Sequence, residues 1–443
     1  MAQDANPRVG ALRLHPIART LGAAVVDDED HVHLGAYARQ HVQYLALDAV
    51  ARDDYGDRMR LGLRHGCGMG RAIVRTAMPQ SAAMQAPPAS SPADAAAPDG
   101  DPAIEALRGW AALMVLVTHY APLVAAPSGA WGFASTGVDL FFVLSGAVFA
   151  PYLFGRPLQL LPHLIRRFFR LYPLYLCALL LYAALRLPAA NAWEHFGTHL
   201  VMGHTLQSLE IAHFYNAAFW SLPPELEYYL LLPLLAWCAT RIGFGWLLAA
   251  AAAMHLLLVA AASPGEGVSA RAVATLHAPG LLVEFMLGSL AYALAASPKP
   301  GLAALWRLLA GLLVLAATGW LFASQVAPVN GQAQTPPAWI GGNIGMGAAL
   351  GYALVVSALA RPQRRSAGWF TPGFVLMGQL SYGVYLFHNA APPLLARWLP
   401  SVTGAAAVLV CTCATLLAAW AAHRAVERPL RRFGRALGER FRR

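Results

Sequence analysis

The sequence has few charged residues for its length. Of its 443 residues, 12% are charged and 58% are hydrophobic, whereas soluble globular proteins are about 25% charged and about 45–50% apolar. A soluble fold cannot bury this much apolar surface under so little polar cover, and the mean hydropathy of +0.48 agrees. These values exclude ordinary soluble domains, coiled coils and disulfide scaffolds. They indicate a polytopic membrane protein.

Lysine and cysteine are also scarce. The chain has a single lysine, Lys299, and five cysteines, an odd number that predicts no disulfide framework. Cys411 and Cys413 lack the spacing and the companions of a zinc site, so no metal site is predicted. The net charge of +10 comes from arginines at the ends of apolar runs. This placement indicates membrane topology, and no nucleic-acid partner is expected.

The first hundred residues have no long apolar run. Residues 1–78 carry both charge signs, and residues 79–103 are rich in Ala, Pro, Ser and Asp, as disordered linkers are. No secretory signal peptide is predicted, because the basic segment and the apolar core of such a peptide are missing. We interpret residues 1–103 as a poorly ordered extension and linker. The alternative is that translation starts at Met78 or Met84.

Apolar runs recur from about residue 104 to residue 423, each close to the roughly 20 residues that a helix needs to cross a bilayer. The predicted fold is all-α, with about ten transmembrane helices in a domain over residues 104–430 and a basic cytoplasmic tail over residues 431–443. The predicted spans are residues 106–124, 137–155, 171–187, 224–240, 244–262, 273–295, 303–324, 339–359, 373–396 and 404–423.

The basic residues alternate between the two sides that these spans define. Ten spans place both termini on one side, and the loops of that side hold Arg166, Arg167, Arg170, Arg241, Lys299, Arg361, Arg364 and Arg365. The tail on the same side is rich in arginine, whereas the opposite loops hold few basic residues: Arg271, Arg397 and at most Arg186. This asymmetry follows the positive-inside rule and predicts that both termini are cytoplasmic.

Several ionisable side chains fall within the predicted spans, where they are costly unless they face a cavity or a polar partner. These residues are Arg108, His119, Asp139, Glu225, Glu227, Glu284 and His388. Arg108 and His119 are eleven residues apart, which is within about 20° of three helical turns and about 16 Å along the axis. The pair therefore suits an anion at the cytoplasmic mouth and proton chemistry near the midplane. The alternative is a helix-end arginine and a histidine that bonds a neighbouring helix.

Three further clusters combine polar side chains with helical spacing. Arg167 and Arg170 are neighbours on a helix and suit phosphate binding, although a positive-inside anchor would also explain them. Glu225 follows Ser221 and two prolines at the start of a span, so it is a capping residue or faces a cavity. The third cluster is a polar stripe, which a hydrogen-bond seam between helices would also explain. Its members are Ser381, Tyr385 and His388.

Together these residues resemble the acyltransferase-3 family of integral membrane acyltransferases, over about residues 102–432. The pair Pro223-Pro224 departs from the family pattern, and residues 1–100 have no counterpart in it. The matching elements, in family order, are Arg108 to His119 (R-x10-H), Gly137 to Gly146 (FFxLSG), Arg167 to Pro173 (RxxR-x-x-P), Trp220 to Glu225 (WSLxxE) with Tyr228-Tyr229, Phe285 to Gly288 (FxxG), Ser381 to His388 (SYxxYLxH) and Glu427 to Pro429 (E-x-P).

The resemblance implies an O-acyltransferase of the bacterial inner membrane. It would move an acyl group, acetyl by default, from cytoplasmic acyl-CoA to a hydroxyl of a cell-envelope glycan or another carbohydrate-type or lipid-linked acceptor. Membrane lipids are the other expected partner, and acyl-CoA is a co-substrate rather than a permanently bound cofactor.

The resemblance also implies roles for individual residues. His119 would be the general base, Arg167 and Arg170 would bind the phosphates with Arg108 at the mouth, and Glu225 would orient the acceptor or the base. The implied pocket residues are Asp139, Ser145, Trp220, Ser221, Ser381, Tyr382, Tyr385 and His388.

Other functions stay open at this point. A transporter or flippase of a glycan or lipid-linked substrate would also have polar residues at the midplane, although the sequence shows no inverted repeat. A sensor or assembly protein that works through the N-terminal extension is a third possibility, and another membrane acyltransferase superfamily is a fourth. A metal site in the loop 188–222 is the alternative to solvated histidines there. The histidines concerned are His195, His199, His204 and His213.

Overall fold

The structure is a computed structural model that describes residues 101–124, 129–206, 208–261, 276–296, 301–329, 334, 336–360 and 372–441. The predicted N-terminal extension lies outside these residues, apart from its last three. Within the described ranges the chain is helical and forms no β-strand, which confirms the predicted all-α fold.

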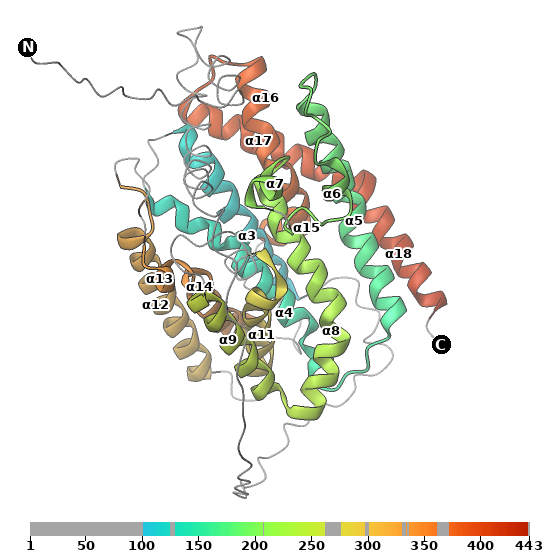
Figure 1. Ribbon diagram of the computed structural model, residues 1–443, viewed down its shortest axis with the longest axis vertical. Helices are drawn as coiled ribbons and strands as arrows, with labels where there is room; N and C mark the ends of the chain where they lie inside the picture. The colour runs from blue at the N-terminus through green and yellow to red at the C-terminus, as the bar shows by residue number, and fades with distance from the viewer. Residues whose placement is uncertain are drawn as a thin grey trace, which may run out of the picture. The chain divides into compact units, whose positions relative to one another are not determined.

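Eleven long helices make up most of the described part of the chain (Figure 1). They are α3 (Pro102–Tyr120), α4 (Gly137–Leu153), α5 (Leu160–Leu185), α8 (Leu222–Ile242), α9 (Phe244–Ala261), α11 (Ala278–Ala295), α12 (Gly301–Gln325), α14 (Ile344–Leu359), α15 (Pro372–Phe387), α17 (Gly404–Ala422) and α18 (Arg428–Arg440). Shorter helices connect them: α6 (Phe196–Leu200), α7 (Leu209–His213), α13 (Ala338–Gly341) and α16 (Ala391–Trp398).

Seven helices in the described part are long and apolar enough to cross a membrane, so the chain is a multi-pass membrane protein. The three other predicted spans overlap α3, α8 and α15. Charged residues interrupt α3 and α8, and α15 has only 16 residues. Arg108 on α3 and Glu225 on α8 explain why the sequences of these two helices are less uniformly apolar. A total of ten spans stays a prediction.

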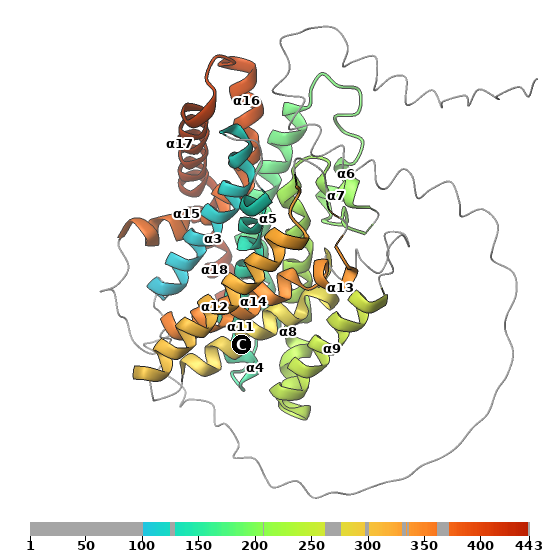
Figure 2. The same cartoon turned by 90° about the vertical axis from the view of Figure 1, so that its left-hand side faces the viewer.

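The helices pack in a row of neighbours. Figure 2 shows α12, α14 and α11 side by side, and α11 in turn packs against α4. The row continues from α4 to α3, then to α15 and α17, while α8 contacts α4, α5 and α9. Since α4 lies between α11 and α3, it occupies the interior of this arrangement.

Two glycine contacts bring these helices into backbone contact. Gly146 on α4 and Gly288 on α11 face each other's backbones, and a Cβ at Gly146 would lie 1.9 Å from the carbonyl oxygen of Phe285. A Cβ at Gly378 on α15 would lie 1.9 Å from the carbonyl oxygen of Glu105 on α3. Only glycine permits such close approach. The second contact places Arg108 beside the polar stripe of α15.

Helix α5 begins eleven residues before the predicted span 171–187. The first turns of α5 carry Arg166, Arg167 and Arg170, which were predicted to lie in a loop. Hydropathy detects only the part of a helix that lies in the apolar core of a membrane. A basic extension of the same helix therefore escapes detection.

The predicted span 373–396 is divided in two. Helix α15 ends at Phe387 and α16 begins at Ala391. Pro392 has no amide hydrogen to donate to the carbonyl oxygen of His388, four residues earlier. That oxygen instead accepts a hydrogen bond from the hydroxyl of Tyr120, at 2.7 Å.

Candidate active site

A pocket of about 720 Å³, including its opening, lies between α3, α4, α5, α8 and α15. The segments that form it are far apart in the sequence, and each contributes predicted site residues. The predicted residues that line the pocket are Arg108, Ser145, Arg167, Arg170, Ser221, Glu225, Ser381, Tyr382 and Tyr385. The resemblance motifs therefore converge on one cavity.

Two of the pocket's arginines are close to carboxylates. Arg108 donates to Oε1 of Glu105 at 2.6 Å, and both side chains are more than four-fifths buried. Arg170 interacts electrostatically with Glu105 and Glu225. These carboxylates hold the guanidinium groups in place and offset part of their charge. The pocket is therefore ready to receive an anion without an array of unpaired cations.

Arg167 is held differently. Its guanidinium carbon lies 4.9 Å from the centroid of the Phe149 ring and 5.6 Å from that of Tyr229. Cation–π contacts of this kind orient an arginine, and a side-chain hydrogen bond with Tyr229 adds to them. Its Nε is buried and has no hydrogen-bond partner. Arg167 lines the pocket, and forked guanidinium donors match phosphate oxygens well.

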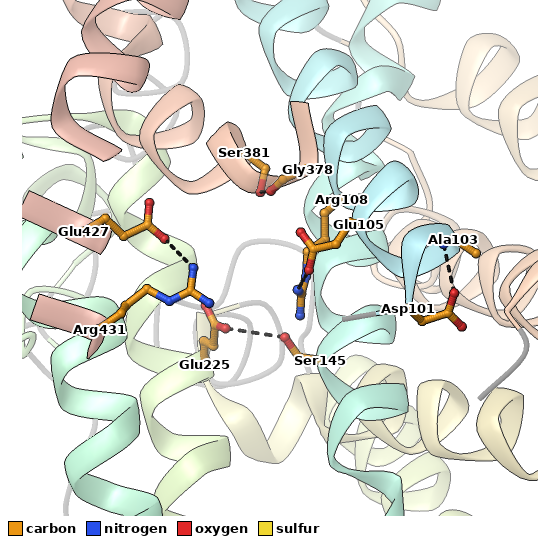
Figure 3. Close-up of polar contacts among 10 residues, drawn as sticks. All are labelled: Asp101, Ala103, Glu105, Arg108, Ser145, Glu225, Gly378, Ser381, Glu427 and Arg431. Carbon is orange, nitrogen blue, oxygen red and sulfur yellow. Dashed lines mark hydrogen bonds and ion pairs between the residues drawn. The ribbon is translucent and has the colours of Figure 1, made fainter. Parts of the chain in front are cut away.

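Glu225 is the carboxylate in the middle of the pocket. It accepts a hydrogen bond from the hydroxyl of Ser145 on α4, at 3.4 Å, and another from the hydroxyl of Tyr229 on its own helix. Figure 3 shows Glu225 and Ser145 facing each other across the pocket, with Arg108 beside them. The carboxylate is therefore oriented from two sides, and it is more than a helix cap.

Hydroxyl groups line another part of the pocket. The Tyr385 hydroxyl donates to the carbonyl oxygen of Ala218 at 2.8 Å and shares a hydrogen bond of 2.6 Å with Ser221. The Tyr382 hydroxyl donates to the carbonyl oxygen of Leu171 at 2.7 Å. These bonds fix the tyrosines of α15 against α5 and against the turn before α8. They hold a rigid wall that suits recognition of a polar substrate.

His119 does not line this pocket. Its ring packs against that of His388, with 4.7 Å between centroids and a tilt of 53°. His388 Nδ1 donates to the backbone oxygen of Tyr385 at 2.8 Å, which leaves Nε2 with its lone pair, and Nε2 is buried without a partner. Tyr385 lines the pocket and lies 6.1 Å from His388, centroid to centroid. The two histidines therefore form a pair directly beyond Tyr385.

Asp139 and Trp220 also lie outside the pocket lining. Asp139 forms a hydrogen bond with Glu284 on α11. Both carboxyl groups lie against Gly345 on α14, where a Cβ would be 2.6 Å from Oδ1 of Asp139. The Trp220 ring packs edge-on against Phe142, at 6.3 Å. In this structure Asp139 joins α4 to its neighbours, and Trp220 belongs to the packing around the site.

Two residues that were not among the predicted site residues hold site side chains in place. Glu105 bonds Arg108, and Tyr229 bonds Glu225 and packs under Arg167. The spacing of three residues between Glu105 and Arg108, and of four between Glu225 and Tyr229, was available as a signal. Which of the many such pairs in a helical chain face a pocket is decided by tertiary packing.

Two of the four histidines of the loop 188–222 are buried inside the protein. His199 and His204 stack 4.2 Å apart with nearly parallel rings, and both are fully buried. Burial lowers the pKa of His199 to about 3 and that of His204 to about 4, so both are neutral near pH 7. Across the described residues, no three His, Cys, Asp or Glu side chains are placed to hold a metal ion.

The comparisons with known proteins point to one family. A family model described as an acyltransferase domain matches residues 101–424, which is most of the chain. No curated protein and no solved structure matches the sequence. The matched range includes every pocket residue named above. On this evidence the chain belongs to the acyltransferase-3 family, and it is an acyl-transferring enzyme of a membrane.

Proposed function

We propose that this protein is an O-acyltransferase that moves an acyl group, acetyl by default, from acyl-CoA to a hydroxyl of a carbohydrate-type acceptor of the cell envelope. The observation that carries the proposal is one cavity lined by Arg108, Arg167 and Arg170, with the packed rings of His119 and His388 directly beyond it. Guanidinium groups suit the phosphates of the donor. The histidines suit the proton transfer.

The donor enters from the cytoplasm in this proposal, and both termini lie on that side of a bacterial inner membrane. The excess of arginine at the ends of the helices that carry the guanidinium groups supports this orientation. Arg167 and Arg170 hold the phosphates, and Arg108 lies at the mouth. The pantetheine arm then extends past Tyr385 toward His119.

His119 acts as the general base in the acyl transfer. It takes the proton of the acceptor hydroxyl while the hydroxyl oxygen attacks the thioester carbonyl carbon. The bond between that carbon and the sulfur breaks, and the imidazolium returns the proton to the thiolate, so the products are an ester and free CoA. The packing of His388 restricts the orientation of the His119 ring, and Glu225 orients the acceptor.

The test uses purified protein in nanodiscs with acetyl-CoA labelled in the acetyl group and an extract of envelope glycans. We expect release of CoA and transfer of label to the glycans. His119→Ala should lower the rate by about 10²-fold to 10⁴-fold, the usual contribution of a positioned general base. His195→Ala, a histidine of the loop 188–222, is the matched control and should keep the wild-type rate. Wild-type protein that leaves acetyl-CoA intact would overturn the proposal.

A further inference from the structure

The connection between α17 and α18 contains a buried carboxylate. Residues 423–427 form a single π-helical turn, a type of distortion that is frequent at functional sites. Glu427 ends this turn and is 3% exposed. It accepts hydrogen bonds from Nδ1 of His423 at 2.9 Å and from Arg431 at 3.2 Å. Glu427 also interacts electrostatically with Arg170 on α5. The start of α18 is therefore tied to an arginine of the pocket.

Helix α18 lies directly against the basic part of α5, as the red and green helices at the right of Figure 1 show. Gly434 makes this contact close: a Cβ there would lie 2.4 Å from Cβ of Phe169. At Gly438, a Cβ would lie 3.3 Å from the backbone oxygen of Pro162. The predicted cytoplasmic tail is thus a packed helix for most of its length. Its position is set by the helix that carries Arg167 and Arg170.

Arg431 lies in the first turn of α18, next to the pocket but not in its lining. Figure 3 shows it extending from the side opposite Arg108, toward the space in which Glu225 and Ser145 lie. Its largest electrostatic interaction is with Arg170, and it also interacts with Arg108. Its side chain is 34% exposed, so it can still reach a ligand in solution.

A concentration of like charge needs an explanation. Arg431 lies within electrostatic range of both Arg170 and Arg108, and it repels them, although Glu427 and Glu105 offset part of this repulsion. The need to pair the buried Glu427 does not explain Arg431, because Glu427 already interacts with His423 and Arg170. An arrangement of this kind is stabilised when a polyanion binds between the guanidinium groups.

We propose that Arg431 is a phosphate-binding residue for the donor, supplied by α18 and oriented by Glu427. The inference rests on the proposed function, in which the donor is an acyl-CoA. Arg431 closes the donor site from the side opposite Arg108, so the C-terminal helix is part of the binding site. Arg431 contributes to holding the donor and takes no part in the chemical step.

The experiment compares Arg431→Gln with the wild type in kinetics with acetyl-CoA and in calorimetric binding of CoA alone. A lost hydrogen bond to a charged group predicts a rise of about 10-fold to 100-fold in KM and in Kd. The kcat should stay within about twofold, because the lost interaction forms equally in the ground state and the transition state. Arg435→Gln, an exposed arginine one turn further along α18, is the matched control and should leave both constants unchanged.

Two further variants separate binding from folding. Arg431→Lys keeps the charge and should recover part of the affinity. Gly434→Ala keeps Arg431 but moves α18 away from Phe169, and it should raise KM without lowering kcat. If Arg431→Gln fails to fold, these two variants decide the question. Unchanged KM and Kd in folded Arg431→Gln would overturn the role of Arg431. If that variant does not fold, unchanged constants in both Arg431→Lys and Gly434→Ala would overturn it. Failure of the wild type to use acetyl-CoA would instead overturn the proposed function.

Discussion

Helices α4 and α12 have almost the same hydropathy and opposite surroundings. The most apolar window has a mean hydropathy of 1.7 in the segment that contains α4 and 1.8 in α12, yet 67% of the first window is buried and only 6% of the second. The lipid-facing side of α12 presents large side chains such as Leu313 and Trp320. The buried face of α4 combines large side chains such as Phe142 with small residues such as Gly146, which lets α11 approach closely. Hydropathy identifies a span, whereas the packing of neighbouring helices decides how much of it is buried.

Equal glycine substitutions in the two helices would test this comparison most severely. Gly146→Leu should abolish folded protein, because the first atom of the new side chain would overlap the backbone of Phe285 on α11. Gly301→Leu, at the start of α12, should fold normally, because nothing lies within 4 Å of the position of its Cβ. The measurement is the yield of monodisperse protein in size-exclusion chromatography. Similar yields for the two variants would contradict the assignment of α4 to the interior.

Removal of a polar group from the pocket should affect activity without a large loss of folded protein. Glu225→Gln removes the charge that Ser145 and Tyr229 hold in place, and we expect a fall of about 10²-fold in kcat. Leu313→Ala on α12 should leave kcat unchanged, because this side chain is 70% exposed. Steady-state acetyl transfer by both purified variants checks the contrast. If Leu313→Ala lowered kcat as much as Glu225→Gln does, the pocket and α12 would not differ in their contribution to activity.

The smallest expected effect is the dependence of stability on pH. Burial lowers the pKa of His199 and of His204 below the value of about 6.5 in an unfolded chain. Their contribution to stability is complete above pH 6.5 and is lost as the pH falls toward 4 and 3. At pH 6 the loss is about 1 kcal/mol for each histidine.

Melting temperatures between pH 7.5 and pH 6 measure this effect. The histidine His277 opposes it, because the hydrogen bond to Glu227 raises the pKa of His277. A comparison of the wild type with His204→Asn isolates one imidazole, and the variant should lose less stability on acidification. Helix α12 has no histidine, so it cannot contribute. An unaltered slope in His204→Asn would show that His204 does not contribute to the loss.

Much of the architecture could be predicted from the sequence because a bilayer imposes simple rules. The length of a span and the positions of the apolar runs gave the all-α fold and placed most helices within a few residues. The spacing of Arg108, Arg167, Ser145 and Glu225 within recognisable motifs gave the residues of one pocket. Such features are local in the sequence, which is why they could be recognised without a structure.

Other features depend on contacts between distant segments and could not be predicted. The hydrogen bond between Asp139 and Glu284 directs Asp139 away from the pocket, although its position in a motif suggested a lining residue. The tail after residue 430 was predicted only as a basic segment, because nothing local shows that Gly434 packs on Phe169. The boundary of α5 differed because a helix can continue beyond the apolar core that hydropathy detects.

The uninterrupted helix from Pro102 to Tyr120 has a consequence for the choice of carrier. It separates Arg108 from His119 by about 16 Å along its axis, and its contact with Gly378 holds it against α15. The helix thus keeps Arg108 and the histidine pair at a fixed separation. A compact donor such as an acyl phosphate is too short to contact both Arg108 and the histidine pair. If the proposed function holds, we therefore expect the enzyme to select its donor by the length of the carrier arm as well as by its charge.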